Sequence, residues 1–277
     1  MNVLGVIPAR YQSTRLEGKP LADILGRPMI QYVYEAASRA RSMGAVIVAT
    51  DDERIRRAVG DFGGQVVMTR PDHKSGTDRV AEVAAGRDAD IVVNIQGDEP
   101  LIDPHMIDEC VQALHINDGA GLSTLMKRID ESAFEDPGVV KVVCDGRGRA
   151  LYFSRSLIPY PRSRTADYAV FEHIGLYAYT KECLLRLSQL PPSRLERIEG
   201  LEQLRALENG IPIQVAETSF TDEMISVDTA EDLARVRDIL SAGVSAQAAG
   251  RGLQRSRNSA DLAASRESVV RESREKR

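Results

Sequence analysis

The sequence of 277 residues contains no tryptophan, only three cysteines and few aromatic residues of any kind. The cysteines, Cys110, Cys144 and Cys183, are far apart and form no CxxC pair, so neither a disulfide framework nor a zinc site is expected. This cysteine usage fits a reducing compartment, and we expect a cytoplasmic protein.

Long apolar runs are also missing. None approaches the roughly 18 residues that a membrane-spanning helix needs. Residues 1–10 contain no basic segment, and their short apolar run is typical of a strand rather than of a signal peptide. We therefore expect no association with a membrane.

The charge balance is slightly acidic, with 36 Lys and Arg against 41 Asp and Glu and a net charge of −5. This balance gives no reason to expect nucleic-acid binding, and an anionic ligand would need a local cluster of positive charge. The hydrophobic content of 43% and charged content of 28% exclude global disorder. The length allows one large domain or two small ones.

Residues 1–240 alternate short β-branched runs with helical patterns. The apolar runs at 3–7, 45–50, 65–68 and 91–95 are typical of strands buried on both faces, and amphipathic segments lie between them at 29–43, 53–62 and 78–85. This alternation predicts a three-layer α/β fold with a mostly parallel central sheet flanked by helices. Further strands are expected at 122–128, 139–144 and 175–179, and further helices at 192–209 and 229–240.

The composition changes after residue 240. Residues 241–277 contain no aromatic residue and carry eight basic and four acidic side chains. We expect a domain over 1–240 followed by a solvated, disordered basic tail, although an arm that touches RNA or a membrane is the alternative.

A cationic loop follows the first predicted strand. It carries Arg10, Arg15 and Lys19 within ten residues, with Ser13 and other small or polar residues between them. Ligands of open α/β sheets bind beyond the carboxyl ends of the strands, and such a loop can direct cations and backbone N–H groups at a polyphosphate. A proline follows Lys19, so this is not a Walker A loop. A solvated charged connection is the alternative to a phosphate-binding loop.

Two aspartates are candidate ligands for a metal ion. Asp98 follows an apolar strand that breaks at Gly97, and Mg²⁺ needs only one or two carboxylates when substrate phosphates supply other oxygens. Asp228 precedes a predicted helix in a pattern close to a capping box, which is compatible with metal binding. Simple turn formation at Asp98 and helix capping at Asp228 are the alternatives. We expect both aspartates to converge on the cationic loop.

The cationic loop lies in a longer motif, Ile7-Pro-Ala-Arg-Tyr-x-Ser-Thr-Arg-Leu-x-Gly-Lys-Pro-Leu, and six further motifs follow it in the chain. Together they resemble the signature segments of the 3-deoxy-D-manno-octulosonate cytidylyltransferase (CMP-Kdo synthetase) family, in the family's order and over roughly residues 1–240. The chain departs from the family's usual residues at Glu17, Gly138 and Thr180. The seven segments are 7–21, 72–79, 94–100, 151–159, 173–179, 201–205 and 227–233.

The resemblance implies a nucleotidyltransferase fold with a mixed sheet and a homodimer formed through the middle segment, about 150–180. It implies CTP and Kdo as substrates and Mg²⁺ as cofactor. In the implied reaction the anomeric 2-hydroxyl of Kdo takes CMP from CTP, which releases pyrophosphate and gives CMP-Kdo for lipopolysaccharide synthesis. The same chemistry on another 2-keto sugar acid (8-amino Kdo or a nonulosonate), a non-catalytic nucleotide-sugar sensor and a glycosyltransferase on a related fold are the alternatives.

The resemblance also implies roles for individual residues, among them Arg10, Arg15, Lys19, Asp98 and Asp228 as catalytic residues. The triphosphate would be held by Arg10, Ser13, Arg15 and Lys19, and the cytosine by Arg70, Ser75 and Gly76. Pro8, Ala9 and Asp98 would also bind the nucleotide. Asp98 and Asp228 would hold Mg²⁺. The sugar acid would contact Gln96, Arg155, His173, Tyr177, Glu202 and Gln203.

Overall fold

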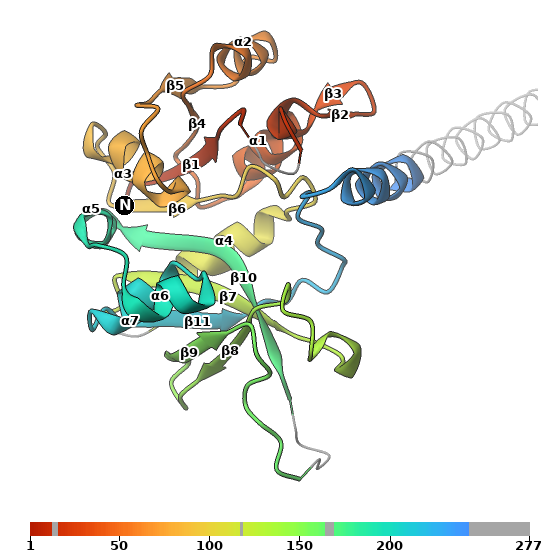
Figure 1. Cartoon of the computed structure of the whole chain (residues 1–277). Coiled ribbons are helices and arrows are strands. Elements are labelled where there is room, and N and C mark those ends of the chain that lie inside the picture. Colours follow the sequence, from red (N-terminus) through yellow and green to blue (C-terminus); the bar gives the residue numbers. More distant parts are fainter. Residues whose placement is uncertain (13–15, 117–118, 164–168, 244–277) are drawn as a thin grey trace, which may run out of the picture.

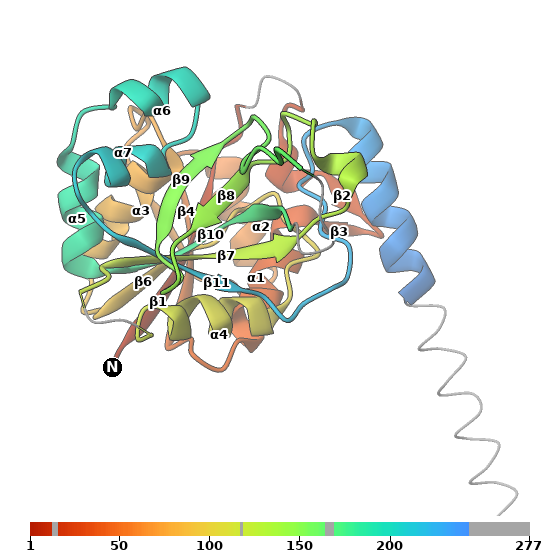
Figure 2. The ribbon, with the colours of Figure 1, turned by 90° about the horizontal axis from the view of Figure 1, so that it is seen from below.

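A mixed β-sheet lies at the centre of the computed structural model, and helices cover both of its faces (Figures 1 and 2). The structure describes residues 1–12, 16–116, 119–163 and 169–243. The main sheet of this described part is formed by β1 (Val3–Ala9), β4 (Ala45–Thr50), β5 (Val66–Met68), β6 (Ile91–Asn94), β7 (Leu122–Arg128), β8 (Lys141–Cys144), β9 (Ala150–Ser154), β10 (Phe171–Thr180) and β11 (Ile213–Glu217).

The strand order is β11-β7-β10-β6-β1-β4-β5, and β8 joins β10 to β9 at one end. Strands β5, β4, β1 and β6 run parallel, whereas β10 runs against its neighbours β6 and β7. This confirms the three-layer α/β fold with a mostly parallel mixed sheet. Because β1 and β6 are parallel neighbours, with Val6 opposite Asn94, the loops that follow them leave the same edge of the sheet side by side.

Two apolar layers pack on the two faces of the sheet. One contains the buried sides of α1 (Met29–Arg39), α2 (Glu53–Asp61) and α4 (Pro104–Ala113), and the other those of α3 (Gly76–Ala85), α5 (Lys181–Gln189) and α7 (Gln203–Glu208). Helix α1 shows how a helix contributes to such a layer: Ile30, Val33, Ala36 and Ala37 recur at helical spacing and are buried together.

A third apolar cluster fixes the C-terminal helix, which covers residues 230–243 of the described chain. Val227 and Leu233 pack there against Ile24 of the hairpin β2 (Asp23–Ile24) and β3 (Arg27–Pro28), and against Met29. The backbone N–H of Val227 donates to the Asp98 carbonyl oxygen at 2.9 Å. Asp228 is thereby held beside the loop that follows β6.

Several predicted boundaries were wrong. Helix α1 ends at Arg39 rather than at residue 43, because Ala40 adopts an extended conformation. The single helix expected at 192–209 is two helices, α6 (Arg194–Glu199) and α7, separated where Gly200 takes a positive φ of 65°. The last helix continues past residue 240 to 243, so three residues assigned to the tail are helical. Helices α4 and α5 and strands β9 and β11 were not predicted.

No helix in the described part of the chain combines the length and apolar character needed to cross a membrane.

Candidate functional site

A cavity of about 330 Å³ opens where β1 and β6 end. Its lining comes from the segments that follow both strands, from the start of α3 and the residues before it, and from Asp228 in the C-terminal region. The predicted residues that line it are Pro8, Ala9, Arg10, Lys19, Ser75, Gly76, Gln96, Asp98 and Asp228. Ser13 and Arg15 lie outside the described residues.

Lys19 lies between the two predicted metal ligands. Its Nζ is 2.6 Å from Asp98 Oδ2 and 2.9 Å from Asp228 Oδ1. Burial alone would lower the pKa of Lys19, but the two carboxylates outweigh this effect and raise that pKa. Two carboxylates that lie far apart in the sequence therefore reach one cationic group in the lining of the cavity.

The carboxylates of Asp98 and Asp228 form a donor set that fits the coordination preferences of Mg²⁺. Nowhere in the described chain do three or more His, Cys, Asp or Glu side chains gather so that they could hold a metal ion. Mg²⁺ commonly takes one or two carboxylates and fills its remaining positions with water and substrate phosphates. Asp98 and Asp228 would be the protein's part of such a site.

Glycines allow the segments around the cavity to approach closely. A Cβ on Gly97 would lie 3.1 Å from the carbonyl oxygen of Pro8, and one on Gly76 would lie 3.3 Å from Pro8 Cγ. Helix α3 starts here with a capping box in which Ser75 Oγ accepts from the Asp78 N–H at 3.1 Å. The positive end of the helix dipole therefore borders the cavity, which favours an anionic ligand.

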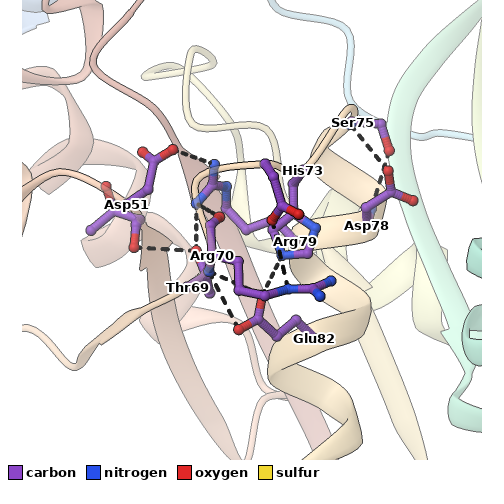
Figure 3. Close-up of polar contacts among 10 residues, drawn as sticks. Asp51, Thr69, Arg70, His73, Ser75, Asp78, Arg79 and Glu82 are labelled. Atoms are coloured by element: carbon purple, nitrogen blue, oxygen red, sulfur yellow. Dashed lines mark hydrogen bonds and ion pairs between the residues drawn. The ribbon is translucent and has the colours of Figure 1, made fainter.

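Arg79 is a cavity residue that was not predicted. Its guanidinium is buried, donates to Asp51 Oδ2 at 2.9 Å and also contacts the Thr69 hydroxyl. Figure 3 shows Arg79 in the middle of this cluster, with Asp51 on one side. The signal in the sequence was a basic residue on the buried face of the amphipathic helix α3.

Arg70, predicted to line the cytosine pocket, lies outside the main cavity. Its side chain is 67% exposed and lies 3.7 Å from both Asp72 and Glu82, beside a separate hollow of about 460 Å³. Figure 3 shows Arg70 with Glu82. Glu82 also accepts from the Arg70 backbone N–H at 3.2 Å. These carboxylates face Arg70 outside the main cavity, and the guanidinium groups in the lining of that cavity belong to Arg10 and Arg79.

The Arg79–Asp51 pair is expected to stabilise the fold around the cavity. Replacing Arg79 with methionine would leave the largely buried Asp51 carboxylate without its partner, so we expect a loss of about 3 kcal/mol in the free energy of unfolding. Urea denaturation measures this loss. Arg235→Met is the matched control: Arg235 pairs with Glu223 on the surface, where the two side chains are 55% and 56% exposed, and little change is expected. Equal losses in the two variants would contradict the prediction.

A smaller hollow of about 100 Å³ adjoins the main cavity and shares Gly76 and Gln96 with it. Tyr177, Glu202 and Gln203, three of the predicted sugar-acid residues, line it. Two buried acceptors in its lining, Asn94 Oδ1 and Glu202 Oε1, have no hydrogen-bond partner among the described residues. Burial also raises the pKa of Glu202. Unpaired buried acceptors are costly, so this hollow suits a ligand that brings hydrogen-bond donors.

A third hollow of about 390 Å³ continues from Gln203 to His173, Gly138 and Val140. His173 is buried, its Nε2 lies 3.0 Å from Thr124 Oγ1, and its ring centroid lies 5.4 Å from that of Tyr177. Burial lowers the pKa of His173 to about 3, so the ring is neutral near pH 7. Strand β10 thus brings His173 and Tyr177, two of the predicted sugar-acid residues, together.

Arg155 is the one predicted sugar-acid residue that lines none of these described hollows. Its Nε donates to the Glu199 carbonyl oxygen and its Nη1 to the Pro137 carbonyl oxygen, both at 2.8 Å. The guanidinium joins the end of α6 to the turn before β8, and its predicted contact with a sugar acid stays a prediction.

Comparisons with known proteins agree on the class of this enzyme. The family model described as "Cytidylyltransferase" matches residues 4–218. A 3-deoxy-manno-octulosonate cytidylyltransferase of Solibacter usitatus (strain Ellin6076) is 54% identical over 243 residues, which cover 87% of this chain and 96% of the relative. One from Geobacter sulfurreducens (strain ATCC 51573 / DSM 12127 / PCA) is 50% identical over 251 residues, which cover 87% of this chain and all of the relative.

A solved structure of a CMP:2-keto-3-deoxy-manno-octonic acid synthetase complexed with CTP matches the fold with a TM-score of 0.83. It is 45% identical and covers 88% of this chain and 100% of its own. A nucleotidyl transferase from Methanothermobacter thermautotroptrophicus, 18% identical with a TM-score of 0.60, covers 87% of this chain and 99% of its own and shares the fold alone. The protein is a cytidylyltransferase, and it belongs to the 3-deoxy-manno-octulosonate cytidylyltransferase family.

Proposed function

We propose that the protein transfers CMP from CTP to the anomeric 2-hydroxyl of Kdo, which releases pyrophosphate and forms CMP-Kdo for lipopolysaccharide synthesis. The observation that carries this proposal is the convergence of Lys19, Asp98 and Asp228 at a cavity that continues through Gln96 into a hollow with unpaired acceptors. The first part suits a charged triphosphate, and the second suits a polyhydroxylated acceptor.

The main cavity would hold and orient the triphosphate. Arg10, Lys19 and the N-terminus of α3 bring positive charge to it, and Arg15 would add a further guanidinium. These groups would stabilise the charge that builds on the departing pyrophosphate as the bond between the α-phosphorus and the bridging oxygen breaks. Asp98 and Asp228 would hold Mg²⁺, which when bound neutralises phosphate charge and lowers the pKa of a coordinated hydroxyl.

The neighbouring hollows would hold the sugar acid. Its hydroxyl groups can donate to Asn94 Oδ1 and Glu202 Oε1, which otherwise stay buried and unpaired. Gln96, which donates to the Gly175 carbonyl oxygen at 3.2 Å, stands between the two substrates. An acceptor fixed in this way would present its 2-hydroxyl to the α-phosphorus in line with the leaving group, so that positioning supplies much of the rate.

Release of pyrophosphate tests this function. We expect release only when CTP, Kdo and Mg²⁺ are present together. Binding of CTP or of CMP-Kdo without any release would contradict an enzyme and favour a sensor. Consumption of a finished nucleotide sugar would instead indicate a glycosyltransferase.

Competition between sugar acids tests the choice of acceptor. Labelled Kdo, 8-amino Kdo and sialic acid are offered together with CTP, and the CMP-linked products are separated. We expect Kdo to give the fastest product formation. Faster turnover of either competitor would overturn the proposed acceptor but leave the cytidylyltransferase chemistry unchanged.

We also propose that the protein is a homodimer that pairs through the segment at about 150–180. Leu151 and Tyr160, which are 62% and 82% exposed, support this proposal because they are large hydrophobic residues on the surface of that segment. Light scattering on the wild type and on Leu151→Asp measures the oligomeric state. A monomeric wild type would contradict the proposal.

We further propose a cytoplasmic location, where the three free thiols would stay reduced.

We propose that residues 1–243 carry the whole activity. Deletion of residues 244–277 is therefore expected to leave kcat and both KM values unchanged, since all the residues assigned to substrates precede residue 229. Steady-state kinetics of the shortened and full chains measure this. A large loss of activity in the shortened chain would show that the C-terminal segment contributes to the site.

A further inference from the structure

Lys141 carries a buried charge that no role above uses. Its side chain is completely buried at the start of β8, and Nζ donates to the carbonyl oxygens of Asp136 at 2.7 Å, Val139 at 2.8 Å and Arg155 at 2.9 Å. An ammonium group has three donors, so all of them are used. Burying this charge is costly unless its donors are satisfied, and here backbone carbonyls replace the water. If position 141 served only to fill the core, an apolar side chain would be enough.

The three carbonyls belong to two separate segments. Asp136 and Val139 lie in the turn that precedes β8, and Arg155 follows β9. The Arg155 side chain returns to the same turn, because its Nη1 donates to the Pro137 carbonyl oxygen at 2.8 Å. The turn is therefore held by Lys141 and by Arg155, and Lys141 also holds the backbone of Arg155.

This turn forms part of the hollow that contains His173. Gly138 and Val140 line the hollow together with His173 and Gln203, and the His173 backbone N–H donates to the Val140 carbonyl oxygen at 2.7 Å. Gly138 contributes only backbone to the wall, because it has no side chain. The shape of the wall thus depends on where the backbone of residues 136–140 is fixed.

We infer that Lys141 is a positioning residue for the sugar acid, because it fixes the backbone wall opposite His173 and Gln203. This inference rests on the proposed function, in which these hollows receive the acceptor. The main cavity lies elsewhere, at the ends of β1 and β6, and its lining includes neither Lys141 nor the turn. Loss of the ammonium would displace the backbone of residues 136–140, which forms a wall of the sugar-acid hollow, and would leave the main cavity unchanged.

Lys141→Met tests the inference, because methionine has similar length but no donor. We expect KM for the sugar acid to rise at least about tenfold, since small displacements of a bound reactant are costly, and KM for CTP to change less than about twofold. Lys141→Gln keeps two donors, and a smaller rise is expected. Lys181→Met is the matched control: Lys181 Nζ donates to the Arg87 carbonyl oxygen at 2.6 Å, outside these hollows, and neither KM is expected to change.

Hydrogen exchange without substrates gives a second readout that does not depend on turnover. In Lys141→Met the backbone N–H of His173 is expected to exchange faster than in the wild type, while the N–H groups of β1 keep their protection. If wild-type protein fails to use Kdo but this local change is seen, the proposed acceptor is wrong and the positioning by Lys141 stands.

A parallel rise of both KM values, or unchanged KM values in a destabilised protein, would overturn the inference and leave Lys141 a structural residue. If Lys141→Met does not fold, Lys141→Gln is judged by the same criteria, and equal effects on the two substrates would again overturn it. Selective loss of sugar-acid affinity in either variant, with Lys181→Met unchanged, supports it.

Discussion

Replacing Asp98 with asparagine is expected to lower kcat at least about 10²-fold, the effect of losing one preorganised electrostatic contact. Asparagine has the same shape but no charge, so it can neither balance Lys19, which lies 2.6 Å from Asp98, nor serve as an anionic ligand of Mg²⁺. Asp228→Asn removes the other carboxylate of the pair, and a loss of the same order is expected. Steady-state rates of pyrophosphate release at saturating CTP and Kdo measure both effects.

The fold should survive these changes. The contact between the loops depends on the Asp98 carbonyl oxygen, which accepts from the Val227 N–H and is unaffected by a change of side chain. Asp72→Asn is the matched control, because Asp72 is an exposed carboxylate near α3 that is 3.7 Å from Arg70 and does not line the main cavity. Wild-type rates in Asp98→Asn or Asp228→Asn would remove that residue from the proposed metal site.

The parts of the site that could be predicted are those set by local pattern and strand direction. The buried strands β1 and β6 are short apolar runs, and parallel neighbours place the residues after them at one edge of the sheet. This rule brings Lys19 and Asp98 together without knowledge of any side-chain contact. This rule does not place Asp228, because the position of Asp228 depends on how the C-terminal helix packs against Ile24 and Met29.

The parts that could not be predicted depend on competition between tertiary partners. A cationic side chain near a phosphate site can turn toward the cavity or away from it, and the sequence does not show which carboxylates it will meet. Arg70 turns outward to Asp72 and Glu82, and Arg79 turns inward to Asp51. Arg155 bridges the end of α6 and the turn before β8. The division of residues 192–209 into two helices was missed because the apolar spacing continues across Gly200, where the backbone turns.

The position of Lys19 leads to the last prediction, which concerns the protein without nucleotide. The ammonium lies between the two carboxylates that would hold a metal ion, so a divalent cation must displace it before both can bind that cation. Lys19→Met removes this competitor and a nearby positive charge. We therefore expect Mn²⁺, used as a probe, to bind the ligand-free variant at least about tenfold more tightly than the wild type, as measured by electron paramagnetic resonance.

The same substitution should have the opposite effect on the nucleotide. Once a cation displaces the ammonium, Lys19 is free to turn to the triphosphate, so Lys19→Met is expected to lower kcat/KM for CTP by about 10²-fold although its metal site binds more tightly. Lys74→Met is the control, because Lys74 lines the same cavity on the side of α3, and no gain in Mn²⁺ affinity is expected. Unchanged Mn²⁺ affinity in Lys19→Met would show that the ammonium and the metal ion do not compete. Tighter metal binding combined with weaker use of CTP would show that Lys19 exchanges the two carboxylates for the triphosphate.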